Sequence, residues 1–145
     1  MSYYEDKINK LKAIFELADD KSPTDIAIVC RQVLEKAIDL VFEYANVKKP
    51  VYASLIELVN NETVKQFFNS DVIIDDLHFI RIVGINAHHD KYIKSTQAKV
   101  ARDNTERLLD YLSSKLIGAV ESEEVIVHET SGIGPSVPKA SAMNE

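Results

Sequence analysis

The sequence predicts an all-α fold: an antiparallel bundle of four main helices with a short helical insertion. First, apolar residues recur at intervals of three and four over most of the first 118 residues, which is typical of amphipathic helices. Second, the only clusters of β-branched residues are residues 72–74, inside a helical pattern, and residues 125–127, isolated in an acidic segment. Third, no series of alternating strand patterns is present, so a sheet has no candidate strands.

The first two helices are expected over residues 3–18 and 23–45. The first carries an apolar face, and it should end at the polar residues 19–21. Ser22 is the expected N-cap of the second helix, with Pro23 at the first helical position. The second helix has the widest apolar surface and is therefore expected at the centre. The residues expected to face inward are Tyr4, Ile8, Leu11, Phe15 and Ala18, then Ile26, Cys30, Val33, Ala37, Val41 and Tyr44.

Pro50 interrupts the helical pattern, and residues 52–60 and 62–69 are predicted to be short helical pieces. Two longer helices follow, over residues 71–88 and from Ser95 to about Leu116, with Gly118 as the expected C-terminal stop. Their inward residues are predicted to be Ile73, Leu77, Ile80, Gly84 and Ala87, then Ala98, Ala101, Thr105, Leu108, Leu112 and Leu116.

The chain of 145 residues divides into an expected bundle domain, residues 1–118, and an acidic linker or disordered tail, residues 119–145. The formal net charge is −6, of which −4 falls in the tail, so neither part carries the basic footprint of a nucleic-acid-binding domain. Cys30 is the only cysteine, which excludes an internal disulfide and a thiolate metal cluster. The absence of a signal peptide pattern and of a membrane-spanning apolar run predicts a cytoplasmic protein that does not enter a membrane.

Most residues that could carry chemistry lie in or just after the helix at 71–88. Gly84 is unusual, because glycine in mid-helix costs ~1 kcal/mol relative to alanine and signals close approach by a neighbouring element. Arg81 and His88 are seven positions apart, which returns them to within about 20° of the same helix face. His89 follows at the helix end. Arg81, His88 and His89 are therefore the candidate catalytic residues.

Other interpretations of these residues are structural. Arg81 would pair with a carboxylate of a neighbouring helix, and the histidines would bond to carbonyls at the helix C-terminus. A metal site built from His78, His88, His89 and Asp90 is disfavoured, because no pair has the i, i+4 spacing of a helical zinc site, and no cofactor is expected.

Two residues of the second helix are explained by its own spacing. Arg31 and Glu35 are spaced for an ion pair, and no neighbour in the sequence supports phosphate binding by Arg31. Cys30 lies on the apolar stripe and is interpreted as a core residue rather than a nucleophile.

These residues resemble the motifs of a known family. The chain resembles a bacterial helical family of unknown function within the HEPN superfamily. The resemblance lies in residues 81–89, in the Arg31 and Glu35 element, and in the alanine-containing helix that ends in residues 108–112. The family pattern reads Arg-x-x-Gly-Asn-x-x-x-His. Arg81, Gly84 and His89 match it, whereas Ile85 replaces the asparagine and Asn86 stands one residue later.

The resemblance implies a function in restriction-modification and phage defence. The family is found at the N-terminus of type I restriction enzyme R subunits, so the expected function is a non-catalytic accessory module that docks other domains, other subunits or nucleic acid such as DNA. The chain has no Gly-x-x-x-x-Gly-Lys-Ser/Thr sequence for ATP.

Two alternatives remain open. One is a metal-independent HEPN ribonuclease, a toxin or abortive-infection factor, in which His88 or His89 would transfer protons and Arg81 would stabilise the phosphorane. The other is a homodimeric helical adaptor. Self-association is expected in either case from the superfamily, and the breadth of the apolar helix faces also favours it.

Overall fold

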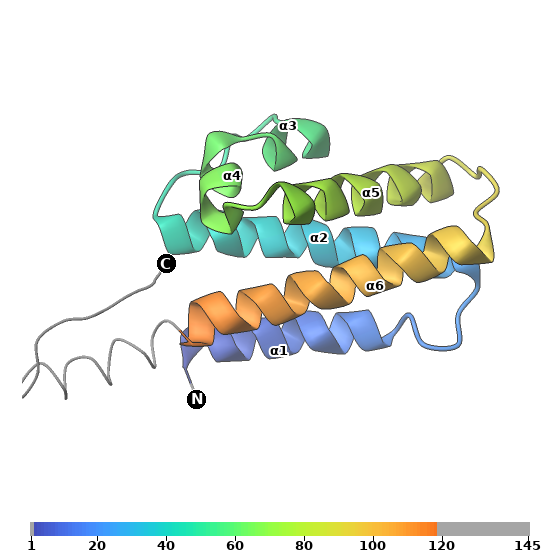
Figure 1. Ribbon diagram of the computed structural model, residues 1–145, viewed down its shortest axis with the longest axis horizontal. Helices are drawn as coiled ribbons and strands as arrows, with labels where there is room; N and C mark the ends of the chain where they lie inside the picture. Colours follow the sequence, from blue (N-terminus) through green and yellow to red (C-terminus); the bar gives the residue numbers. More distant parts are fainter. Residues whose placement is uncertain (1, 119–145) are drawn as a thin grey trace, which may run out of the picture.

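The computed structural model describes residues 2–118, and every regular element in this range is helical (Figure 1). The expected linker or disordered tail at residues 119–145 lies outside the described residues. In chain order the elements are α1 (Tyr3–Glu16), α2 (Pro23–Ala45), α3 (Leu55–Val59), α4 (Glu62–Phe68), α5 (Asp71–His88), α6 (Ser95–Leu112) and the π-helical turn η1 (Ser113–Ile117). The predicted all-α class is therefore confirmed for this part of the chain.

The four longest helices, α1, α2, α5 and α6, lie side by side and alternate in direction along the chain (Figure 1). Helix α2 packs against α1, α5 and α6, which confirms its expected central position. The short helices α3 and α4 lie over the C-terminal end of α2 and beside the first turns of α5 (Figure 1). No described helix is both long enough and apolar enough to cross a membrane.

Serine residues are the N-caps of four described helices. Ser22 Oγ accepts a hydrogen bond from the backbone N–H of Asp25, and Pro23 occupies the first turn of α2, as the sequence predicts. Ser54 and Glu57 form a reciprocal capping box at α3. The remaining capping serines are Ser2 at α1 and Ser70 at α5. These caps satisfy backbone donors that a helix leaves without an internal acceptor.

The expected inward faces agree with the observed core, with few exceptions. Ile8, Cys30, Leu77 and Leu108 are among the side chains that are almost completely buried. Cys30 is a core residue, and burial raises the pKa of its thiol. Tyr44 is the exception on α2: it lies near the helix end with 38% exposure.

The last helical segment ends within one residue of the predicted Leu116, with Gly118 at its C-cap position, but the type of its final turn was not predicted. The α-helical hydrogen-bond pattern of α6 stops at Leu112, and a π-helical turn replaces its final turn. Gly118 has φ −60° and ψ −37°, which are right-handed helical angles, so it does not terminate the helix as a left-handed cap. Left-handed C-caps are found instead at Asn46 after α2 and Asn69 after α4, and Asp20 and Asp90 have positive φ in the segments that follow α1 and α5.

Candidate functional site

Gly84 brings α5 unusually close to α2. A Cβ atom built on Gly84 would lie 2.6 Å from Cβ of Arg31 and 2.9 Å from its Cδ, closer than real side chains approach. The missing Cβ therefore makes room for the aliphatic part of Arg31 to lie against the backbone of α5. This confirms the expectation that the mid-helix glycine marks a close approach.

Two polar contacts fix the head of Arg31. Its Nη1 donates a hydrogen bond of 3.2 Å to the backbone carbonyl of Arg81, on the facing helix. Its Nε lies 3.6 Å from the carboxylate of Glu35, which confirms the predicted i, i+4 ion pair. Because the Arg31 side chain is only 22% exposed, its guanidinium is held in a defined position beside α5.

Arg81 pairs with no carboxylate of the described helices, so that interpretation is wrong for residues 2–118. Its Nε donates a hydrogen bond of 3.3 Å to Nδ1 of His78, one turn earlier on the same helix. All four arginines of the chain are described, and among described carboxylates Arg31 pairs with Glu35, Arg102 with Asp19 and Arg107 with Asp76. Arg81 alone among them forms no such ion pair, although it is half-buried.

A second guanidinium, that of Arg31, is bonded to the backbone carbonyl of Arg81. Burial lowers the pKa of Arg81, and the positive charge of Arg31 lowers it further. From the sequence, Arg31 was expected to lack a neighbour that supports anion binding. In the folded chain Arg81 lies beside it. An oxyanion close to both guanidiniums would reduce the repulsion between them.

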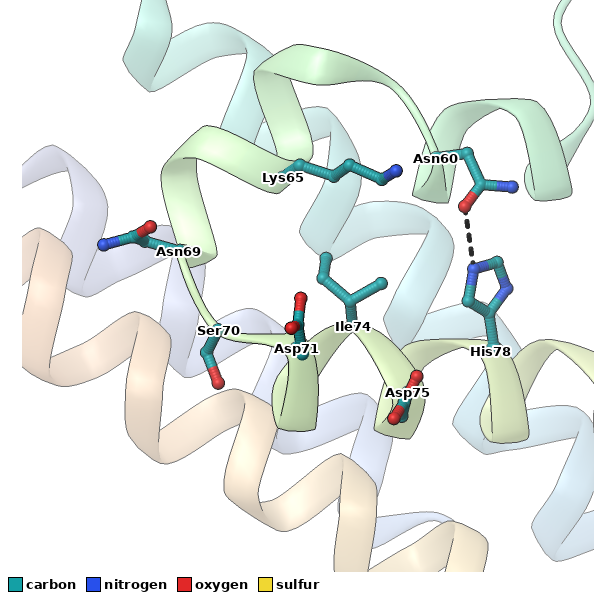
Figure 2. A pocket seen from close by; sticks show the side chains of 8 residues that line it. All are labelled: Asn60, Lys65, Asn69, Ser70, Asp71, Ile74, Asp75 and His78. Atoms are coloured by element: carbon teal, nitrogen blue, oxygen red, sulfur yellow. Dashed lines mark hydrogen bonds between the residues drawn. The ribbon is translucent and has the colours of Figure 1, made fainter.

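His78 continues the polar chain toward α3. Since Arg81 donates to Nδ1, the ring carries its proton on Nε2, which lies 3.0 Å from the Oδ1 atom of Asn60 (Figure 2). Burial lowers the pKa of His78, and the charge of Arg81 lowers it further. His78 is therefore held as a neutral imidazole that orients Arg81.

An open pocket of about 620 Å³ lies on the Asn60 side of His78. In Figure 2, Lys65 of α4 extends across it toward Asn60, and Asp71 and Asp75 of α5 lie on the other side. Charges of both signs line this pocket, and its two carboxylates, Asp71 and Asp75, outnumber its one lysine, Lys65.

His88 lines a separate pocket of about 280 Å³ between α2 and α5, together with Arg31, Glu35 and Gly84. Arg81 is not among the residues that line it. Arg81 and His88, which the helix spacing places on one face, therefore do not line this pocket together, and the Arg81 side chain donates to His78 instead.

The remaining candidate residues are more exposed. His88 and His89 are both exposed, and their ring centroids are 5.9 Å apart. Neither imidazole forms a hydrogen bond to a described residue, so the expected bonds to carbonyls at the helix end are not made within residues 2–118. Asn86 is partly buried on the last turn of α5. Within the described range no group of His, Cys, Asp and Glu side chains is arranged to hold a metal ion.

Two contributors to the site could not be recognised from local sequence patterns. Asn60 is the C-cap residue of the short helix α3 and lies 18 residues before its hydrogen-bond partner His78. Gln32 lines the His88 pocket from an exposed position on α2. Both meet α5 only through tertiary packing. Gly84 was the one local signal for this junction, since its missing side chain indicates that something packs there.

No protein-family model matches the chain, and comparison with curated proteins and with solved structures gave no match either.

Proposed function

We propose that this chain is a non-catalytic helical accessory module that docks to its partner by binding an oxyanion between Arg31 and Arg81. The observation that carries the proposal is the half-buried Arg81 guanidinium, which forms no ion pair with any described carboxylate, while the Arg31 guanidinium is bonded to the backbone carbonyl of the same residue. Desolvated like charges are costly unless an opposite charge joins them. A phosphate or carboxylate group of a partner supplies that charge.

The arrangement of the histidines favours docking over catalysis. A general acid or base must be held within hydrogen-bond reach of the proton it transfers. His88 and His89 are exposed and no described side chain or carbonyl orients them, while Arg81 is turned toward His78. A ribonuclease would need Arg81 and one of these histidines on the same phosphate.

The sequence motifs give the proposal its context. We propose an HEPN-like bundle, similar to the N-terminal region of type I restriction R subunits, because Arg31, Arg81 and Gly84 meet at one junction of α2 and α5. Its partners would be other domains or subunits of a restriction complex, with nucleic acid as the alternative source of the anion. The net negative charge of the chain favours a local anion contact over a broad nucleic-acid surface.

Calorimetric titration with pyrophosphate at low salt tests the site. Wild type should bind, and Arg81→Gln should weaken binding about tenfold or more, because hydrogen bonds to charged groups contribute ~1.5–3 kcal/mol. Arg107→Gln is the matched control, since it removes an exposed guanidinium that Asp76 already neutralises at 3.0 Å. Equal affinity of Arg81→Gln and wild type, or an equal loss in both variants, would contradict the proposal.

A hexaglutamate peptide and a short oligonucleotide, titrated in the same way, distinguish the two sources of the anion. Binding of the peptide that requires Arg81 indicates a protein partner, and binding of the oligonucleotide that requires Arg81 indicates nucleic acid.

A further inference from the structure

Two grooves run along the sides of α1, one against α2 and one against α6. The α1–α2 groove has a volume of about 290 Å³ and an apolar floor made by Leu11, Ile14 and Leu40. Lys7, Lys10 and Lys36 stand at its rim. An apolar floor between lysines fits a short segment with aliphatic residues flanked by acidic ones.

The lysines of this groove are poorly neutralised by described residues. Of its two acidic residues, Asp39 pairs with Lys49, and Glu43 accepts a hydrogen bond from the neutral Tyr3 hydroxyl, so Glu43 is the one carboxylate of the groove that faces the three rim lysines. Lys36 forms no ion pair with a described carboxylate.

The other two rim lysines have only weak partners. Lys10 lies 3.8 Å from an exposed Asp6, and Lys7 lies over the Tyr3 ring, 5.3 Å from its centroid. Exposed pairs of this kind contribute little. The rim of the α1–α2 groove therefore presents cationic charge.

We infer that residues 121–129 of the same chain bind in the α1–α2 groove. This segment lies outside the described residues, and its sequence is Glu-Ser-Glu-Glu-Val-Ile-Val-His-Glu. The three aliphatic residues 125–127 match the apolar floor, and the flanking glutamates match the lysine rim. This inference concerns a different face of the bundle and does not depend on the Arg31–Arg81 site.

The described chain stops at a place from which this groove can be reached. The turn η1 packs against α1, so the last described helical residues, just before Gly118, lie beside the end of the bundle where α1 begins (Figure 1). Seven residue steps from Gly118 to Val125 span up to ~23 Å. Leu11 lies eight residues along α1 from its first residue, a rise of ~12 Å. A tether this short also gives an effective concentration in the millimolar range, so a weak contact is sufficient.

The charge of the second groove explains why the first is favoured. The charged residues that line the α1–α6 groove, of about 260 Å³, are Lys12 and Arg102 against Glu16, Asp19, Glu106 and Asp110, so acidic residues predominate. Its arginine, Arg102, is already paired with Asp19. Like charges would repel the glutamates of residues 121–129 there.

Paramagnetic relaxation in the full-length chain tests the inference. A spin label on Ser122→Cys reacts at one site, because Cys30 is completely buried. Amide signals in residues 7–14 of α1 and 36–43 of α2 should be at least halved in intensity. Mixing spin-labelled chains with isotope-labelled, unmodified chains should leave those signals unchanged, because the contact is intramolecular.

Two variants of the spin-labelled chain complete the test. Replacing Val125, Ile126 and Val127 with serine should restore the groove signals, and Lys36→Glu should restore them in part. The inference is overturned if the broadening persists in the serine variant, moves to the α1–α6 groove, is absent from both grooves, or occurs between different chains.

Discussion

Replacing Gly84 with alanine is expected to lower the free energy of unfolding by ~1–3 kcal/mol, the usual cost of overpacking a close contact. The new Cβ would lie 2.6 Å from Cβ of Arg31, an atom too near the backbone to move aside alone. The gain of ~1 kcal/mol in helix propensity opposes this cost only partly. Urea denaturation measures the change, and the displaced Arg31 should also weaken pyrophosphate binding.

Gly118→Ala is the matched control. Gly118 has right-handed helical angles, and an added Cβ would meet no atom within 4 Å. Stability should stay unchanged or rise by up to ~1 kcal/mol. If both glycine variants behaved alike, the close approach of α2 and α5 at Gly84 would be refuted.

Truncating Phe68 to alanine is expected to cost ~3–5 kcal/mol, the range measured for large buried aromatic side chains. Phe68 is 2% exposed, with ring centroids 4.9 Å from Phe67 and 5.4 Å from Tyr111. Its backbone carbonyl also accepts a hydrogen bond of 3.0 Å from Tyr111. Because α4 has only seven residues, it depends on this packing rather than on its own helix propensity.

Tyr52→Ala provides the comparison for Phe68→Ala in urea denaturation. Tyr52 is also aromatic, but it is 98% exposed in the segment between α2 and α3. Its loss should change stability by no more than ~0.5 kcal/mol. A small effect of Phe68→Ala would show that the insertion does not dock on the bundle as described.

The helices of this chain could be predicted closely because their signals are local. Ser22 and Pro23 determine where α2 begins, and Pro50 prevents α2 from continuing into the next segment. The period of apolar residues then identified the buried faces of α5 and α6. The π-helical end of α6 carries no comparable local signal, and it was missed.

The candidate site could be predicted only in part because its contacts span long sequence separations. The Arg31–Glu35 pair follows from helix spacing, and Gly84 indicated a close approach without identifying the neighbour. The approach of Arg31 to Arg81 joins residues 50 positions apart. Helix spacing gives the direction in which the Arg81 side chain leaves the helix axis. Whether its guanidinium then bonds to a carboxylate or to His78 depends on tertiary packing.

An NMR titration of the arginine side-chain Nε–Hε signals with pyrophosphate reports directly on anion binding between Arg31 and Arg81. The four arginines provide an internal control, since Arg102 and Arg107 are paired with aspartates elsewhere on the bundle. We expect the signals of Arg31 and Arg81 to shift together along one saturating curve, while those of Arg102 and Arg107 stay in place. Equal shifts of all four signals, or shifts confined to Arg102 and Arg107, would contradict an oxyanion site between Arg31 and Arg81.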